Sequence, residues 1–425
     1  MMQNNTISAN WKKPFFAFWI SQAFSLFGSS LVQFALVWWL TKTTGSASIL
    51  ATASAVAVIP EIIVSPFAGA IIDRSNRKRV MILADAIIAI ATIILAVVFY
   101  FGAVQIWQIY LLMFVRSVGG AFHYPAEQAS ISLMVPEKHL SRIAGLNQAL
   151  YGSINIIAPP AGALLLELLD VQGTMAVDFV TAFIAISILL FIHIPQPETE
   201  GEREPISVPS LFADLKGGFL YILNWKGLIA LIGIAMVFKL ALSPAFSLLP
   251  LLVSKHFNGE AAQFALVESI SGIGVVIGGL ILGVWGGFKK RIWTMWMSLS
   301  SIGLCLLWVS TMQPSQFSLF LPAMFLFGFM VPFIDGPFIA IIQANVSPEF
   351  QGRVLTMTTS LLWLTTPIGL GIAGPVADAF GIPIWYAIAG SLCLAGMLVG
   401  ILLPQVRNIE GNNEKTVPEV SASVD

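Results

Sequence analysis

Long apolar runs dominate this chain and constrain its fold more than any other feature. Twelve of them recur along the 425 residues, each near the ~20 residues that a helix needs to cross a bilayer core. Lipid offers no hydrogen-bond partner to backbone groups, and the alternating pattern of a membrane barrel is absent, so we expect helices. The predicted spans are 15–40, 48–72, 80–102, 107–134, 141–167, 173–194, 226–252, 262–287, 290–312, 317–345, 352–378 and 383–405.

The composition argues against several other classes of protein. Only 10% of the residues are charged, whereas a soluble domain carries about 25%, and the net charge of −1 indicates no nucleic-acid partner. Cys305 and Cys393 both lie within apolar runs, so we expect no disulfide framework, no metal site and no cofactor. The sequence carries neither a phosphate-binding loop nor a nucleophile elbow, which argues against an ATP-driven pump and against a membrane enzyme.

The basic residues predict the orientation of the spans. With the N-terminus inside, 17 of the 21 lysines and arginines fall in cytoplasmic segments, as the positive-inside rule requires. Lys42 and Lys255 fall outside, and Arg116 and Lys239 lie within spans. We therefore predict a multi-pass protein of the cell (inner or plasma) membrane with both termini in the cytoplasm.

A polar segment divides the twelve predicted spans into two sets of six. Residues 195–225 contain a run rich in proline and glutamate, which suits a cytoplasmic linker, with an amphipathic helix near 208–221. The predicted organisation is an N-terminal half at 1–194, this linker, a C-terminal half at 226–405 and a disordered cytoplasmic tail at 406–425.

The two halves also echo each other along the sequence. At an offset of 212 residues, Pro125 and Pro136 are matched by Pro337 and Pro348, and the basic run 77–79 is matched by 289–291. A parallel repeat of two six-span halves is the internal symmetry of one class of secondary transporters.

The loop between the second and third predicted spans has a recognisable pattern. Its residues Gly69-x-x-x-Asp73-Arg74-x-Asn76-Arg77 resemble the corresponding loop of the major facilitator superfamily. Asn76 replaces the usual second glycine of that loop, and asparagine also tolerates a left-handed turn.

This resemblance implies a role in closing the cytoplasmic side. We expect Gly69, Asp73, Arg74 and Arg77 to be gating residues, and the alternative is that the loop is a topology signal alone. The 212-residue echo places Trp285 at the position of Asp73. The duplicated basic part therefore carries the topology signal, and Asp73 is the better candidate for a gate.

The fourth predicted span carries its polar residues on one face. At 3.6 residues per turn, Arg116, Gly119/Gly120, His123 and Glu127 lie on that face. Charges inside a membrane favour a bundle interior or a wet cavity, and the small residues allow close packing. Arg116 followed by Gly120 resembles the arginine motif of proton-coupled members of the superfamily. Arg116 is expected to act in coupling or in a structural bond between helices. His123 is a packed residue or a proton carrier, and Glu127 pairs at the gate or handles substrate or protons.

Other spans contain isolated ionisable residues. An unpaired charge in lipid is costly, so we expect each to face a central cavity and titrate, or to form a structural ion pair within its own half. These residues are Glu61, Lys239, Glu268 and Asp335. Four further acids lie close to predicted outer ends, where solvated structural roles are expected: Glu167, Asp170, Asp178 and Asp378.

Neutral polar and small residues complete the candidate site. Gln22, Ser25, Ser29 and Gln33 follow one side of the first span, and they line a cavity or bond to a neighbouring helix. A second set, assigned to helix packing, partly resembles the glycine-proline motif of exporters in the superfamily: Gly120, Pro159, Pro160 and Gly162.

Motifs in both halves resemble one group within the superfamily, the macrolide-efflux group. They are Gln22-x-x-Ser25, Thr44–Ala47, Arg116–Ala126, Val135–Glu137, Phe257–Gly259 and Gly352–Val354. This resemblance implies a proton-coupled antiporter that exports amphiphilic drug-like compounds such as macrolides by alternating access and confers antibiotic resistance. We expect a small-molecule substrate, protons and membrane lipid as partners, and a monomer. The alternatives are an exporter of an endogenous metabolite such as a siderophore and, less favoured, a channel or membrane enzyme.

Overall fold

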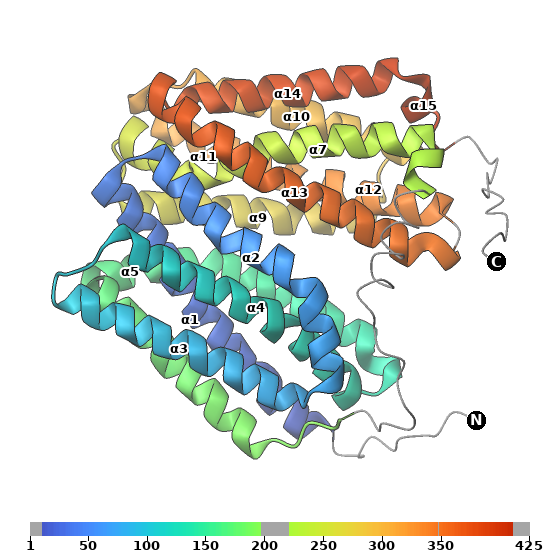
Figure 1. The fold of residues 1–425 in the computed structure, drawn as a ribbon. Coiled ribbons are helices and arrows are strands. Elements are labelled where there is room, and N and C mark those ends of the chain that lie inside the picture. Colours follow the sequence, from blue (N-terminus) through green and yellow to red (C-terminus); the bar gives the residue numbers. More distant parts are fainter. Residues whose placement is uncertain (1–10, 197–220, 347, 411–425) are drawn as a thin grey trace, which may run out of the picture. The chain divides into compact units, whose positions relative to one another are not determined.

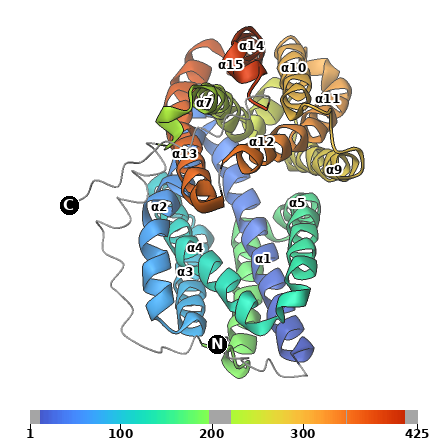
Figure 2. The same ribbon diagram turned by 90° about the vertical axis from the view of Figure 1, so that its right-hand side faces the viewer.

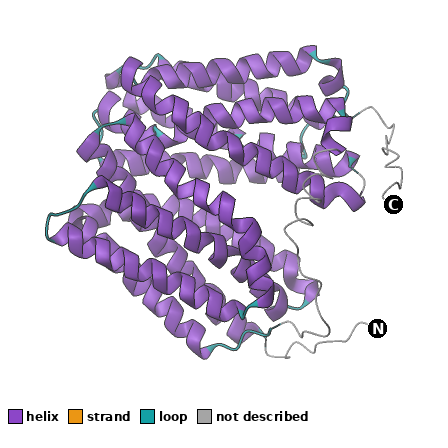
Figure 3. Ribbon diagram, in the orientation of Figure 1, coloured by secondary structure: helices purple, strands orange, loops and turns teal. Residues whose placement is uncertain are grey.

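The computed structural model describes residues 11–196, 221–346 and 348–410, and these residues are helical without any strand (Figure 3). The predicted linker at 195–225 and its amphipathic helix near 208–221 therefore lie mostly outside the described residues. The beginning of the predicted tail differs from the expected disorder, because Pro404–Arg407 form the short helix α15 and both Val406 and Ile409 are buried. Residues 411–425 of that tail lie outside the described residues.

The first part of the chain forms long helices whose ends follow from local chemistry (Figure 1). Gly45 ends α1 in a left-handed conformation with φ 58°, which glycine adopts at little cost. The side chain of Asn76 accepts a hydrogen bond from the Arg79 N–H at 3.1 Å and so caps α3. Asp170, with φ 56°, divides α5 into two helices. The bounds are α1 Lys12–Thr44, α2 Ala47–Arg74, α3 Arg77–Tyr100, α4 Ile106–Met134 and α5 Glu137–Phe191.

The second part contains long helices joined by short irregular turns. Two glycines in left-handed conformations, Gly286 and Gly287, end α9 ahead of the basic run 289–291. The bounds are α7 Lys226–Ser247, α8 Leu249–Leu251, the π-helix η1 Leu252–His256, α9 Ala261–Trp285, α10 Arg291–Ser310, the 3₁₀ helix η2 Pro314–Gln316, α11 Phe317–Met330, α12 Pro332–Asn345, α13 Pro348–Phe380 and α14 Ile382–Leu402.

The described chain contains twelve long helical segments. Ten helices pass a test of length and apolar composition, among them the continuous stretch of η2, α11 and α12 at Pro314–Asn345. The helix α5 counts twice because Asp170 breaks it, and α4 has the length of its neighbours but is not among the ten. Each segment overlaps one of the twelve predicted spans, so the prediction of an all-α membrane protein is confirmed.

The helices form two compact units. The described residues of unit 1 are 11–45, 52–196 and 259–269, and the remaining described residues form unit 2. In unit 1, α1 packs against α5, and α3 packs against α4 and α5; Figure 2 shows α1 between α4 and α5. In unit 2, α10 packs against α14, and α7 packs against α13 and α14.

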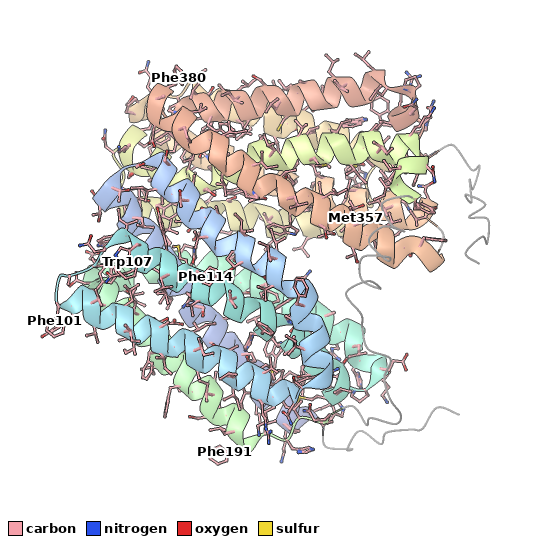
Figure 4. The ribbon with its side chains drawn as sticks, viewed as in Figure 1. Phe101, Trp107, Phe114, Phe191, Met357 and Phe380 are labelled. Carbon is pink, nitrogen blue, oxygen red and sulfur yellow. The ribbon has the colours of Figure 1, made fainter. Side chains whose placement is uncertain are left out.

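Close helix contacts depend on small residues, because apolar side chains gain little by leaving lipid for a helix interface. In unit 2 a Cβ on Gly390 of α14 would lie only 2.7 Å from the carbonyl oxygen of Gly303 of α10. Large apolar side chains cover the outer surfaces of the units instead. Phe101, directly after α3, and Phe191 and Phe380 at helix ends all project outward (Figure 4) and are strongly exposed, as expected for side chains that contact lipid.

Candidate functional site

A buried ion pair joins four helical segments of unit 1. Nη1 of Arg116 in α4 lies 3.0 Å from Oδ2 of Asp178 in the second part of α5, and the two side chains are only 13% and 3% exposed. The guanidinium also donates to the carbonyl oxygen of Ser29 in α1 at 3.0 Å and to Thr92 in α3 at 3.4 Å. The hydroxyl of Ser29 donates to the other oxygen of Asp178 at 3.4 Å. Both charges are therefore satisfied within the helix bundle, as buried charges must be.

The Arg116–Asp178 pair overturns the expectation for Asp178 and identifies a partner of Arg116. Asp178 was expected to be a solvated acid near an outer end, but it is almost fully buried, because α1 and α5 approach each other closely. Gly28 of α1 permits the approach: a Cβ there would lie 3.0 Å from Oδ1 and 3.1 Å from Cα of Asp178. Arg116 forms the inter-helix bond that was one of its two predicted roles.

A second titratable cluster connects α3 with α4. Nε2 of His123 lies 3.3 Å from Oδ1 of Asp85, and both side chains are largely buried. Oδ2 of Asp85 has no hydrogen-bond partner among the described residues. Glu127 is half-buried and follows His123 by one helical turn of α4. The cluster thus contains two acids and one histidine within a membrane-crossing bundle.

The sequence reasoning missed Asp85, although the rule that selected Glu61 also applies to it. Both are single acids inside an apolar run. The packing of α3 on α4 involves one of the two adjacent glycines of α4. A Cβ on Gly119 would lie 2.6 Å from the Ile88 side chain, whereas a Cβ on Gly120 would meet no atom within 4 Å. Gly119 is therefore the residue in close contact with α3.

The predicted polar stripe of α1 does not line one continuous surface. Gln22 and Ser25 are buried, and Oε1 of Gln22 has no hydrogen-bond partner within the described structure. Ser29 belongs to the ion pair of Arg116, while Gln33 is exposed. The stripe therefore divides between the interior of unit 1 and its surface.

The predicted packing motif lies on α5. Gly162 is buried against α1, where a Cβ would lie 2.9 Å from the ring of Phe34. Pro159 is buried beside it, while Pro160 is exposed and lines a cavity of unit 1. Gly162 therefore lies in close contact with α1, while the assignment of the whole set to helix packing stays a prediction.

The remaining charged candidates, Glu61, Glu268, Lys239 and Asp335, are less buried than Asp178. The Glu61 N–H donates to the Ser117 hydroxyl at 3.0 Å, and the Glu61 residue is exposed on unit 1. Glu268 is half-buried. In unit 2, Lys239 of α7 is near enough to Asp335 of α12 for their charges to interact, but among the described residues they form no ion pair within 4.0 Å.

The loop after α2 is described only in part. The side chains of Asp73 and Arg74 lie outside the described residues, and a Cβ on Gly69 would meet no atom within 4 Å. Arg77 donates from Nη1 to the carbonyl oxygen of Ala129 at 2.7 Å, and its N–H donates to Gln196 at 3.1 Å. Arg77 thereby holds the start of α3 against α4.

The same loop refines the role of Asn76. Its φ of −69° is extended rather than left-handed. Asn76 therefore replaces the usual glycine as a helix cap and not through a left-handed turn.

At the other end of unit 1 lies a cavity of about 1310 Å³. Its wall includes Trp38, Trp39 and Phe99, and charged side chains including Lys42 and Glu260 stand among its lining residues. Across the described part of the chain, no group of three or more histidine, cysteine or acidic side chains is arranged to hold a metal ion.

Two units of membrane-crossing helices with buried charge pairs are typical of an integral membrane transporter. The family model described as "Major Facilitator Superfamily" matches residues 18–359 and 229–424. The chain belongs to the Major Facilitator Superfamily, and it is a transporter of small molecules rather than an enzyme.

Relatives of the chain include named efflux proteins. It is 33% identical to "Macrolide efflux protein A" of Streptococcus pyogenes over 94% of this chain and 98% of that protein. The protein of the same name from Enterococcus faecalis is also 33% identical, over 77% of this chain and all of the relative. "Multidrug efflux pump Tap" of Mycolicibacterium fortuitum is 25% identical over 90% of this chain and 94% of the pump.

Solved structures support the same fold. The nucleoside transporter NupG superposes with a TM-score of 0.72 at 13% identity, over 91% of this chain and 98% of that chain. A POT family transporter gives a TM-score of 0.68 at 13% identity, over 91% and 95% of the two chains. At such low identity these likenesses concern the fold alone.

Proposed function

We propose that this protein is a proton-coupled exporter of amphiphilic drug-like compounds such as macrolides. The observation that carries the proposal is the 33% identity to a macrolide efflux protein over 94% of the chain. In this proposal the protein is a monomer in the lipid of the plasma membrane, with both termini in the cytoplasm. The proposed organisation is two halves at 1–194 and 226–405, a linker at 195–225 and a cytoplasmic tail at 406–425. The two halves move so that a site near the midplane opens alternately to each side of the membrane.

The titratable cluster of α3 and α4 supports the proton-coupling part of this proposal. Ionisable groups inside a membrane are costly and mark ion or proton pathways. A protonated His123 beside an ionised Asp85 forms an ion pair, and their atoms are 3.3 Å apart. A second proton on Oδ2 of Asp85 removes this attraction and leaves the imidazolium uncompensated, so the charge state of the pair changes the packing energy between the two helices.

Glu127 extends the proposed proton route along α4. It is four residues from His123, which places the two about 6 Å apart along the helix axis.

Glu61 and Glu268 are proposed as further proton or substrate contacts, together with the Lys239–Asp335 pair of unit 2. On α1, the exposed Gln33 is proposed to contact substrate, and the buried Gln22 and Ser25 are proposed to bond within the helix bundle. Arg116 and Ser29 are proposed to keep α1 and α4 in register with α5 while the cluster titrates.

Gating is proposed for the loop between α2 and α3. Gly69, Asp73, Arg74 and Arg77 would form or release cytoplasmic contacts as the halves move. The bond from Arg77 to the carbonyl oxygen of Ala129 at 2.7 Å supports a mechanical role for this arginine, since it joins the loop to the helix that carries the cluster.

The proposal is tested by the drug susceptibility and drug content of cells that overexpress the chain. We expect lower accumulation of a macrolide such as erythromycin, with normal accumulation restored by a protonophore. A strain that expresses the Asp85→Asn variant at the same level serves as the control. Unchanged accumulation with normal membrane expression would contradict macrolide export, and a protonophore-insensitive decrease would contradict proton coupling.

A further inference from the structure

The cavity of unit 1 has the construction of a site for a bulky organic cation. It lies at the end of the unit away from the Asn76 loop, between α1, the end of α3, the first part of α5 and the start of α9. Its volume of about 1310 Å³ exceeds the upper end of the ~300–1,000 Å³ range of ordinary ligand pockets. Apolar side chains form its wall, including Ile157 and Leu164.

Aromatic rings give the cavity a fixed surface for a positive charge. The Trp38 ring stacks on the Phe264 ring with centroids 5.6 Å apart and an interplanar angle of 14°. The Phe34 ring also stacks on the Phe264 ring, with centroids 5.2 Å apart. Trp39 packs edge-on against Phe99 at 5.2 Å on the same cavity wall. Rings held in this way attract cations through their electron-rich faces.

The ammonium group of Lys42 itself lies over the Trp38 ring and beside Glu260. Its nitrogen lies 5.3 Å from the centroid of the Trp38 ring and 3.1 Å from Oε2 of Glu260. An aromatic face below a cation and a carboxylate beside it is the arrangement that recognises an alkylammonium group. Lys42 is half-exposed, so its side chain can move away at small cost when another cation competes for the position.

The cavity lining contains more acidic than basic residues, which favours the binding of a second cation. Glu167, Asp170 and Glu260 face a single lysine, Lys42, among the charged residues that line the cavity. Since Glu260 already pairs with Lys42, two carboxylates remain without a basic partner in the described structure. The break of α5 at Asp170 brings one of these carboxylates to the rim of the cavity.

We propose that this cavity binds an amphiphilic organic cation, with its charge over Trp38 and near Glu260 in the position that Lys42 takes, and its apolar body against α5 and α9. Glu167 and Asp170 set the preference for positive charge. The proposal rests on the proposed export function for its biological role, in which it names the charge and class of the substrate and gives it a second position along its route. The site itself can be tested without any transport.

The test measures binding of tetraphenylphosphonium to the purified full-length protein in lipid nanodiscs by equilibrium dialysis, with protein-free nanodiscs as the baseline. Tetraphenylborate, which has nearly the same shape and the opposite charge, is the matched probe. We expect saturable binding of the cation and no saturable binding of the anion. Binding of the cation should weaken as salt is raised, because the carboxylates of the rim are exposed.

Three variants assign the binding to this cavity. Lys42→Met removes the competing ammonium and should tighten cation binding about three- to fivefold, whereas Glu167→Gln should weaken it by a similar factor. Glu137→Gln changes an exposed acid at the opposite end of the first part of α5 and should leave binding unchanged. Each position is exposed in this unit, and equal elution volumes of the purified variants verify their folding.

Equal binding of both probes, or a Lys42→Met affinity equal to that of the unaltered protein, would overturn the proposed site. A failure of the export function is distinct from this result. Charge-selective binding that follows the variants supports the site even where no proton-driven export occurs. Export that proceeds normally while the two variants bind the cation like the unaltered protein removes the site and leaves the export function standing.

Discussion

Arg116 in α4 donates a hydrogen bond to Asp178, 62 residues further along the chain, across 3.0 Å in the interior of unit 1. The carbonyl oxygen of Ser29 accepts a second bond from the same guanidinium. This network joins α1, α4 and α5 through one cation, so the energetic cost of breaking it is shared by three helices.

We predict that Asp178→Asn destabilises the protein by roughly 3–5 kcal/mol, because it leaves a buried guanidinium without a counter-charge. The measurement is the midpoint of thermal unfolding in detergent. The double variant Arg116→Met/Asp178→Leu should recover most of the lost stability, since both buried charges are gone. Equal stability of the single variant and the unaltered protein would show that the pair is not structurally important.

Asp85 and His123 should separate coupling from binding. Asp85→Asn keeps the size of the side chain but removes both its negative charge and its capacity to take up a proton. We predict that it abolishes drug uptake driven by a pH gradient while substrate exchange without a gradient continues. Counterflow and gradient-driven uptake in the same proteoliposomes provide the two readouts. A proportional loss of both would mean that Asp85 supports the fold and does not couple protons.

The loop between α2 and α3 allows a test of gating against simple topology. Arg77→Gln and Arg79→Gln each remove one positive charge from the same loop, but only Arg77 donates through its side chain to Ala129. We expect Arg77→Gln to lower transport at least fivefold, and Arg79→Gln to have little effect. Similar activities of the two variants at equal expression would reduce the loop to a topology signal.

Helix packing in unit 2 can be tested on a single helix. An alanine at Gly390 of α14 would place its Cβ 2.7 Å from the Gly303 carbonyl oxygen, while an alanine at Gly396 would only touch Ile234 at 3.4 Å. We predict that Gly390→Ala costs about 1–3 kcal/mol through overpacking. Gly396→Ala should be neutral or slightly stabilising, because alanine favours a helix. Comparable unfolding midpoints for both variants would contradict the close approach of α10 and α14.

The helices were predictable because membrane thickness fixes their length and lipid forces backbone groups to pair within each segment. The interior contacts were not, since they depend on which faces of distant helices meet. Asp178 was assigned to an outer end from its distance to the span boundary, yet Gly28 lets α1 cover it. Gly119 and Gly120 are both small residues near the predicted polar face, and the sequence does not say which of them contacts α3, because one residue rotates a helix face by about 100°.

The charged lining of the unit 1 cavity was only partly predictable. Glu167 and Asp170, predicted to be solvated acids near outer ends, are exposed, and the structure also places both at a cavity with Lys42 and Trp38. Spacing along the chain gave no sign of this, because Glu260 joins them from a segment about 90 residues away. Tertiary contacts of this kind follow from helix packing and not from local pattern.

Gradient-driven uptake in proteoliposomes tests proton-coupled export most directly. Purified protein is reconstituted so that its cytoplasmic face is exposed, and the lumen is made acidic in the presence of radiolabelled erythromycin. Protein-free liposomes under the same gradient correct for passive trapping of the basic drug. We predict uptake above this baseline that disappears when nigericin collapses the pH gradient. Uptake that equals the protein-free baseline, or that persists without a gradient, would contradict proton-coupled export.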